Sequence, residues 1–195
     1  MKDEFRAVPS DTAAVVGSDV VMECSPPRGN PAPVVKWKRD GDNLDLTSSS
    51  RVRIDNGGNL VIYAAEKSDA GRYQCSAENV ASSRLSRPVR LRVNEEPAFV
   101  TRPPPEKSAL AGHDLVIECQ VDGDPHPNVR WSKDGDVLES GKRIKVVAGK
   151  GLRLLNVHPT DAGVYVCIAE NEAGSVEAST SVTVSEPPVS QLIFK

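Results

Sequence analysis

The sequence predicts an all-β chain built from two tandem β-sandwiches. The first observation is a set of residues that occurs twice, the second copy lying 92 to 95 positions after the first: Cys24, Trp37, Tyr73 and Cys75, then Cys119, Trp131, Tyr165 and Cys167. The second is a series of short β-rich runs between turn signals, with no helical periodicity of useful length. The third is the length of 195 residues, which fits two domains of ordinary size.

Seven strands are expected in each repeat, from alternating β-formers bounded by turn residues. In the first repeat they lie at Asp11–Val16, Asp19–Cys24, Val34–Lys38, Arg51–Asp55, Leu60–Ala64, Gly71–Glu78 and Pro88–Asn94. In the second repeat they lie at Glu106–Ala111, Asp114–Gln120, Asn128–Lys133, Arg143–Val147, Leu152–Val157, Gly163–Glu170 and Ala178–Val184. The cluster from Asn56 to Asn59 contains two glycines and supplies the positive φ values of a hairpin turn.

The repeated Cys…Trp…Asp-x-Gly-x-Tyr-x-Cys frame resembles that of immunoglobulin domains, and the Trp-x-Lys/Arg-Asp-Gly stretches resemble their I-set subtype. The resemblance implies two I-set sandwiches, each with one disulfide between strands B and F: Cys24 with Cys75, and Cys119 with Cys167. The tryptophan covers the disulfide, and the tyrosine closes the corner before strand F. Each crosslink closes a loop of about 50 residues, which contributes roughly 4 kcal/mol in the chain-entropy model.

The expected domains are residues 1–95 and 96–187, followed by a tail or the start of a further linker at 188–195. The connection from Val93 to Phe99 is short and contains Pro97, so it favours an extended pair of domains with limited bending. Paired cysteines point to an oxidising compartment; a cytosolic array of similar domains with reduced thiols is the alternative. The chain has no apolar run long enough to span a membrane, so we expect an excised extracellular fragment.

The stretch CSPPRGNPAPVVKWKRDG with RVRIDNGGNLVI resembles the second immunoglobulin domain of roundabout axon-guidance receptors, and the second repeat resembles their third. This resemblance implies the extracellular side of a cell membrane and a secreted leucine-rich-repeat ligand, Slit. Heparan sulfate and other receptor ectodomains are the further partners. In that family the main Slit surface lies on the first immunoglobulin domain, which this chain lacks. The alternatives are another neuronal I-set adhesion molecule, homophilic or heterophilic, and a passive spacer.

Strand alternation predicts a cation strip on the outer face of the first domain. Trp37, Tyr73 and Cys75 point inward, so five basic side chains on strands C, F and G point outward: Lys36, Lys38, Arg72, Arg90 and Arg92. Clustered cations favour a sulfated glycan or an acidic partner. The alternative is a solvated face whose charges discourage association.

The same alternation predicts an aliphatic column on strand F of the second domain, formed by Val164, Val166 and Ile168. Three β-branched residues on an outward face suggest a protein contact. Scattered apolar surface, or cover from a neighbouring loop, is the alternative.

Neither an enzyme nor a cofactor site is expected. The chain has no nucleophile elbow, phosphate loop or zinc-helix motif. His113, His126 and His158 lack ligand spacing. The net charge of −3 is too mild to suggest nucleic acid. Arg51 with Asp69, and Arg143 with Asp161, are expected to tie the base of each sandwich rather than to bind a partner.

Overall fold

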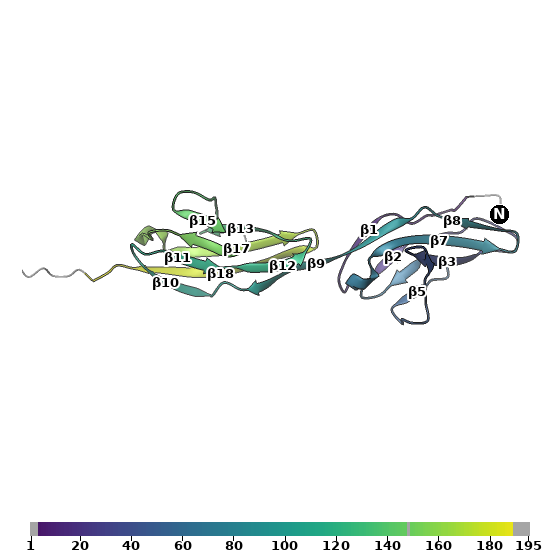
Figure 1. Cartoon of the computed structure of the whole chain (residues 1–195), viewed down its shortest axis with the longest axis horizontal. Coiled ribbons are helices and arrows are strands. Elements are labelled where there is room, and N and C mark those ends of the chain that lie inside the picture. The colour runs from purple at the N-terminus through teal and green to yellow at the C-terminus, as the bar shows by residue number, and fades with distance from the viewer. Residues whose placement is uncertain (1–3, 148, 189–195) are drawn as a thin grey trace, which may run out of the picture. The chain divides into compact units, whose positions relative to one another are not determined.

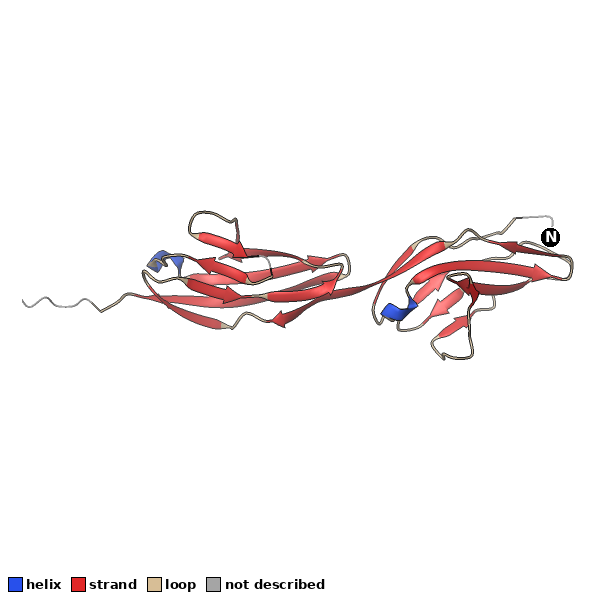
Figure 2. Cartoon of the chain, in the orientation of Figure 1, coloured by secondary structure: helices blue, strands red, loops and turns tan. Residues whose placement is uncertain are grey.

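The structure is a computed structural model that describes residues 4–147 and 149–188. The chain divides into two compact units between Glu95 and Glu96 (Figure 1). Nearly all of the regular structure is strand, and the short 3₁₀ turns η1 (Lys67–Asp69) and η2 (Pro159–Asp161) are the helical elements of the described part (Figure 2). Within those residues, no helix has the length and hydropathy needed to cross a membrane.

The first unit contains two facing sheets. The larger sheet has the order β1 (Thr12–Val15), β9 (Val89–Thr101), β7 (Gly71–Asn79), β3 (Val34–Arg39) and β4 (Asp42–Asn43), with β8 (Ser82–Leu85) also paired to β7. The smaller sheet has the order β2 (Val20–Met22), β6 (Leu60–Ile62) and β5 (Val52–Ile54). Strand β1 runs parallel to β9, and the other strand pairs described in this unit are antiparallel.

The second unit repeats this arrangement. Its larger sheet has the order β10 (Glu106–Leu110), β18 (Gly174–Ser185), β17 (Gly163–Asn171), β13 (Asn128–Lys133) and β14 (Asp136–Leu138), with β10 parallel to β18. The smaller sheet has the order β11 (Leu115–Glu118), β16 (Gly151–Leu154) and β15 (Ile144–Val147). Strand β12 (Gln120–Asp124) pairs with β9, where the Thr101 hydroxyl donates to the side-chain oxygen of Gln120 at 3.2 Å.

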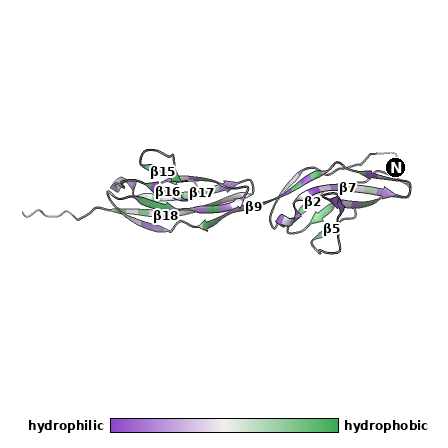
Figure 3. Cartoon of the chain, viewed as in Figure 1, coloured by the Kyte–Doolittle hydropathy of each residue, from purple (hydrophilic) through white to green (hydrophobic). Residues whose placement is uncertain are grey.

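Each unit has one core, centred on its disulfide. Cys24 is bonded to Cys75 and Cys119 to Cys167, as predicted. The largest buried side chains around them are those of the repeated frame, all at most 2% exposed: Trp37, Tyr73, Trp131 and Tyr165. Hydropathy alternates along the strands because one side chain faces this core and the next faces solvent (Figure 3). The all-β fold of two disulfide-bonded sandwiches is confirmed.

The structure adds four short strands that the sequence pattern does not predict, namely β4, β8, β12 and β14. Strand β9 also continues to Thr101, so the segment from Val93 to Phe99, expected as a linker, is extended strand. The run Pro103–Pro105 separates β9 from β10. Proline has no amide hydrogen for a sheet ladder, so this run interrupts the strand where it passes from β12 to β18.

The two tryptophans differ in their hydrogen bonds. In the first unit the Trp37 Nε1–H donates to the Gly58 carbonyl at 2.9 Å, in the turn between β5 and β6. The Asn59 side chain completes this turn, since its Oδ1 accepts the Cys24 amide at 2.9 Å. The turn therefore supports both the indole and the disulfide.

In the second unit the Cys119 amide donates to the Lys150 carbonyl at 3.4 Å. The buried Trp131 Nε1–H finds no acceptor among the described residues. Gly151 begins β16 at φ +125°, and a Cβ added there would lie 2.1 Å from the Ile117 carbonyl oxygen. Only glycine fits this position, so no side chain is present there to accept the cysteine amide as Asn59 does in the first unit.

Replacing Gly151 by alanine should lower the free energy of unfolding by more than about 2 kcal/mol, because the backbone must shift and the φ value is strained. Gly141→Ala is the control, since a Cβ there meets nothing within 4 Å, and it should change stability by less than about 0.5 kcal/mol. Urea unfolding followed by circular dichroism measures both. Equal midpoints for the two variants would show that Gly151 is not constrained.

Candidate binding surfaces

The Arg–Asp pairs predicted at the base of each sandwich are present. Arg51 Nη1 lies 3.0 Å from Asp69 Oδ2, and Arg143 Nη1 lies 3.0 Å from Asp161 Oδ2. The same Arg51 nitrogen donates to the Tyr63 carbonyl at 3.1 Å. Burial opposes ionisation of Asp161, but the hydrogen bonds from Arg143 and the His158 amide, together with the positive charge of Arg143, outweigh it and hold the pKa of that carboxyl below its ordinary value. These arginines are committed to the fold.

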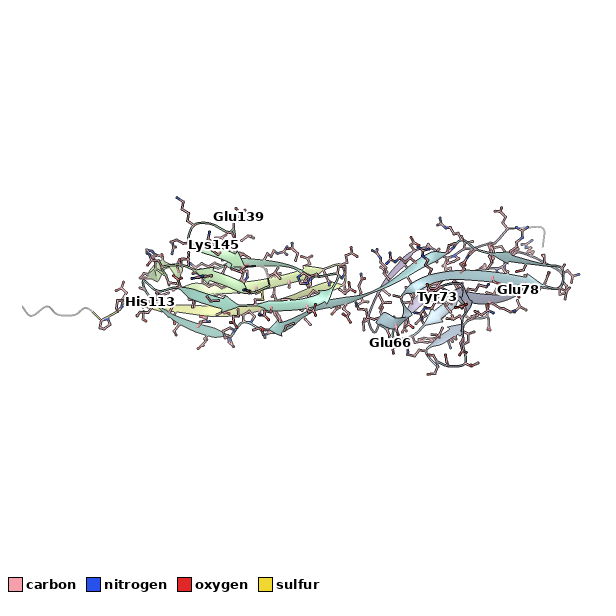
Figure 4. All side chains as sticks on the ribbon, in the orientation of Figure 1. Glu66, Tyr73, Glu78, His113, Glu139 and Lys145 are labelled. Atoms are coloured by element: carbon pink, nitrogen blue, oxygen red, sulfur yellow. A yellow bond between two sulfur atoms is a disulfide. The ribbon has the colours of Figure 1, made fainter. Side chains whose placement is uncertain are left out.

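The buried tyrosines close the neighbouring corners. The Tyr73 hydroxyl donates to the Asp69 carbonyl at 2.6 Å, and the Tyr165 hydroxyl donates to the Asp161 carbonyl at 2.7 Å. Figure 4 labels Tyr73 within the first unit. Burial raises the pKa of Tyr73 and of Tyr165 from 10.0 to about 12. Both groups are structural and lie away from the outer faces described next.

The structure places the cation strip on one outer face, over β3, β7 and β9. Lys36 is paired with Ser76 in register, Lys38 with Gln74, and Arg72 with Arg90, while the residues between them are inward and buried. Lys36 is neutralised, because its Nζ lies 2.8 Å from Glu78 Oε2, and this hydrogen bond lowers the pKa of Glu78. The positive charge of Lys38 also lowers the pKa of the Glu78 carboxylate.

The other three cations, which we name the arginine trio, are exposed: Arg72, Arg90 and Arg92. In the described part of the chain, no carboxylate oxygen lies within 4.0 Å of their guanidinium nitrogens. Arg90 and Arg92 line a surface groove of about 420 Å³ with Asp11, Thr12 and Ala13 of the β1 edge. Asp11 accepts the backbone amide of Arg90 at 2.8 Å, so its carboxylate orders the strand edge.

The aliphatic column lies on β17 of the second unit, facing outward. Val164 is 44% exposed, and Val166 and Ile168 are half-buried. Val166 is paired with Ser132, which in turn is paired with Val137 on β14. Val137 is 68% exposed, so the apolar surface extends beyond the three residues predicted.

Sequence reasoning missed Val137, Glu78 and Asp11 as parts of these surfaces. Val137 follows Asp134-Gly135, a strong hairpin signal that could have identified β14. The pairing of Glu78 with Lys36 requires the register of β3 against β7, which the pattern of inward residues alone leaves open. Within residues 4–147 and 149–188, no three His, Cys, Asp or Glu side chains gather as a metal site.

Comparison with protein families places both units among immunoglobulin domains. Residues 97–184 match the immunoglobulin I-set domain, and residues 2–79 match a further immunoglobulin domain. The chain is 42% identical to human Roundabout homolog 1 and 38% identical to the sax-3 protein of Caenorhabditis elegans, each over 188 residues and 96% of this chain. The chain belongs to the roundabout family. It spans 11% of the length of the human protein and 15% of the worm protein.

Solved structures similar to this roundabout-family chain are also multidomain immunoglobulin assemblies. Extracellular domains 3–5 of Drosophila OTK match with a TM-score of 0.80 at 27% identity, covering 93% of this chain and 61% of that chain. Immunoglobulin domains 1–4 of Sidekick-1 match with a TM-score of 0.80 at 28% identity, covering 93% and 48%. The neighbours therefore support the tandem sandwich fold found here.

Tyr73→Phe and Tyr165→Phe should each lower the free energy of unfolding by about 1 kcal/mol at neutral pH, because a buried Asp carbonyl loses its donor. Tyr63→Phe is the control, since its hydroxyl makes no hydrogen bond in the described residues. Urea unfolding at pH 7 measures the losses. A Tyr63→Phe loss as large as the other two would contradict this assignment.

The wild-type protein should lose stability as the pH rises from 10 to 12. The folded pKa of both tyrosines lies near 12, above the unfolded value of 10.0, so their contribution is complete below pH 10 and disappears as pH passes the folded value. The double Tyr73→Phe/Tyr165→Phe variant should lose less stability over this interval. Parallel pH dependences of the two proteins, measured by urea unfolding, would exclude these tyrosines as the cause.

Proposed function

We propose that the chain is an extracellular recognition segment of a roundabout-type guidance receptor, corresponding to its second and third immunoglobulin domains. We further propose that the first unit binds sulfated glycan, such as heparan sulfate, through the arginine trio. The observation that carries the glycan proposal is the direct opposition of Arg72 and Arg90 on neighbouring strands, with no carboxylate partner among the described residues. The disulfide in each unit supports the extracellular location.

An unpaired cross-strand arginine couple is costly to the fold. Like charges directly opposite each other on a sheet destabilise it. Three other exposed cations are paired with acids: Lys36 with Glu78, Arg130 with Glu170, and Arg153 with Asp114. The trio instead gathers three cations on neighbouring strands with no such pairing among the described residues, which favours an anionic ligand. The planar guanidinium fork can also donate two parallel hydrogen bonds to two oxygens of a tetrahedral sulfate group.

The relation to Slit follows from the family. We infer that the main Slit contact lies on a preceding domain and that this segment positions that domain and adds glycan contacts. A sulfated chain held on the first unit would raise the local concentration of a ligand that binds the same chain. Contacts with other receptor ectodomains would use the second unit.

The heparin test uses two variants with the same net charge. Arg90→Glu/Arg92→Glu should lower the salt concentration at which the protein elutes from heparin, because two of the three unpaired cations are reversed. The control, Arg53→Glu/Arg153→Glu, makes the same charge change on the smaller sheets, where Arg53 lies over Tyr63 and Arg153 is paired with Asp114. If both variants elute at the same salt concentration, the weaker heparin binding is explained by net charge alone, and the glycan site is rejected.

The spacer alternative has a separate test. In the complete receptor, the two domains would be replaced by unrelated sandwich domains of equal length, and ligand-dependent signalling and adhesion would be measured in cells. We expect a clear loss of response, because the surfaces described above would be absent. Full activity of the replacement receptor would show that the segment only sets distance.

A further inference from the structure

The outer face of the larger sheet in the second unit is organised in rows across the strands. In one row, Ser132 on β13, Val166 on β17 and Ser179 on β18 are in register. In the next row, Arg130, Ile168 and Glu177 occupy the same three strands. The aliphatic column therefore forms the centre of the face, and a pair of serines and a pair of opposite charges flank it symmetrically.

Ser132 shows that the apolar surface is continuous. Its side chain points outward, yet Ser132 is only 8% exposed, because it lies between its register partners Val137 and Val166. Val137 itself is 68% exposed. A ridge of aliphatic surface thus runs from the edge strand β14 to the centre of the sheet.

The corresponding face of the first unit has the opposite character. Arg72, Gln74 and Ser76 stand on β7 where Val164, Val166 and Ile168 stand on β17, each set alternating with the buried tyrosine and cysteine. Of these six, Ser76 is covered and buried. The arginine trio would repel a second copy of itself. The same fold therefore presents a polar, cationic face in one unit and an aliphatic face of mixed charge in the other.

The charges beside Ile168 are suited to each other across a two-fold axis. Glu177 has no partner among the described residues, whereas Arg130 Nη2 lies 3.2 Å from Glu170 Oε2 and both side chains are more than half exposed. Asp134, the other acid near β17, is already engaged: its Oδ1 accepts the Val164 amide at 2.8 Å and its Oδ2 lies 3.6 Å from Lys133 Nζ. Glu177 is therefore the acid available to a partner.

We propose that this face is a self-association surface, on which a second copy of the chain packs with the two-fold axis along β17. Within each row, this axis places the β13 residue of one copy opposite the β18 residue of the other copy. Val166 then meets Val166 of the partner copy, each Ser132 faces a Ser179, and each Arg130 faces a Glu177. Glu170, the next outward residue of β17, meets Glu170 of the partner, and the Arg130 of each copy, 3.2 Å from its own Glu170, offsets this like charge. Both copies run in the same direction, as two receptors anchored in one membrane would.

Further features of the face agree with this packing. The same axis places Val137 opposite the segment of Pro104 and Pro105, two exposed prolines whose carbonyls accept Thr180 Oγ1 and the Ser181 amide. Apolar surface thus meets apolar surface at both edges. Serines beside the column are small enough for two sheets to approach to about 10 Å, the usual spacing of packed sheets.

The size of the face predicts a weak complex. Four strands about 4.8 Å apart and a few rows of side chains give on the order of 500 Å² for each copy. The total falls below the roughly 1,200 Å² typical of stable complexes, so we expect micromolar-to-millimolar association in solution. Confinement to a membrane raises the effective concentration of the chains, so a contact this weak is sufficient for them to associate there.

The first test compares two valine substitutions by sedimentation equilibrium of the whole chain at high concentration. Val166→Arg should raise the dissociation constant at least about tenfold, because it places two cations on the axis. Val116→Arg is the control, since Val116 is 43% exposed on β11 of the other sheet, and it should leave the constant within about twofold. A wild-type chain that stays monomeric, or equal effects of the two variants, overturns the proposal.

The second test checks the arrangement with charge reversals at exposed positions, which spare the core. Arg130→Glu alone and Glu177→Arg alone should each weaken self-association, because each homodimer then opposes like charges twice. An equimolar mixture of the two variants should restore association to near the wild-type level, since both contacts between positions 130 and 177 of the mixed dimer then join opposite charges. A mixture no stronger than the separate variants rejects the axis along β17, and circular dichroism confirms that each variant is folded.

Discussion

The disulfide that joins the two sheets of each unit beneath an indole is the constraint on which the other features depend. Cys24–Cys75 and Cys119–Cys167 fix which side chains of β7 and β17 face inward. Period-2 alternation then determines the outward residues of these strands and of their neighbours. Each unit's disulfide lies on the inner face of its larger sheet. By fixing which residues face inward, it also determines that the arginine trio and the aliphatic column lie on the outer faces.

One frame supports two different surfaces because outward positions make few demands on the core. The buried tyrosines and cysteines of β7 and β17 are matched, while the residues between them change from Arg72 and Gln74 to Val164 and Val166. Charge in the first unit and aliphatic surface in the second can thus evolve without loss of the fold. The two domains accordingly present outer faces of different chemistry on the same fold.

The sequence was sufficient to predict the sandwich class, the disulfide partners and the outward residues, since all three depend on spacing and alternation. Periodicity did not reveal the short strands such as β14, because so few residues carry little periodic signal; for β14 only the turn residues Asp134-Gly135 point to a strand. Nor could the sequence predict that Glu78 neutralises Lys36, which depends on strand register and side-chain rotamers.

The support beneath the indoles also could not be predicted from the shared frame. The side chain of Asn59 completes the turn below Trp37, whereas the second unit has Gly151 beside the Ile117 carbonyl and leaves the Trp131 donor without an acceptor in the described chain. That difference arises from close packing of backbone, which the pattern of core residues does not encode.

The parallel pairing at the edge of each larger sheet has a mechanical consequence. Thr12–Val15 lie in register with Leu91–Asn94, and Glu106–Leu110 with Ser181–Ser185. Tension along the chain pulls the first strand of each pair toward the amino end and the second toward the carboxyl end. The ladder is loaded in shear, so its hydrogen bonds share the force instead of opening one after another. Each unit is therefore built to resist a stretching force applied at its two ends.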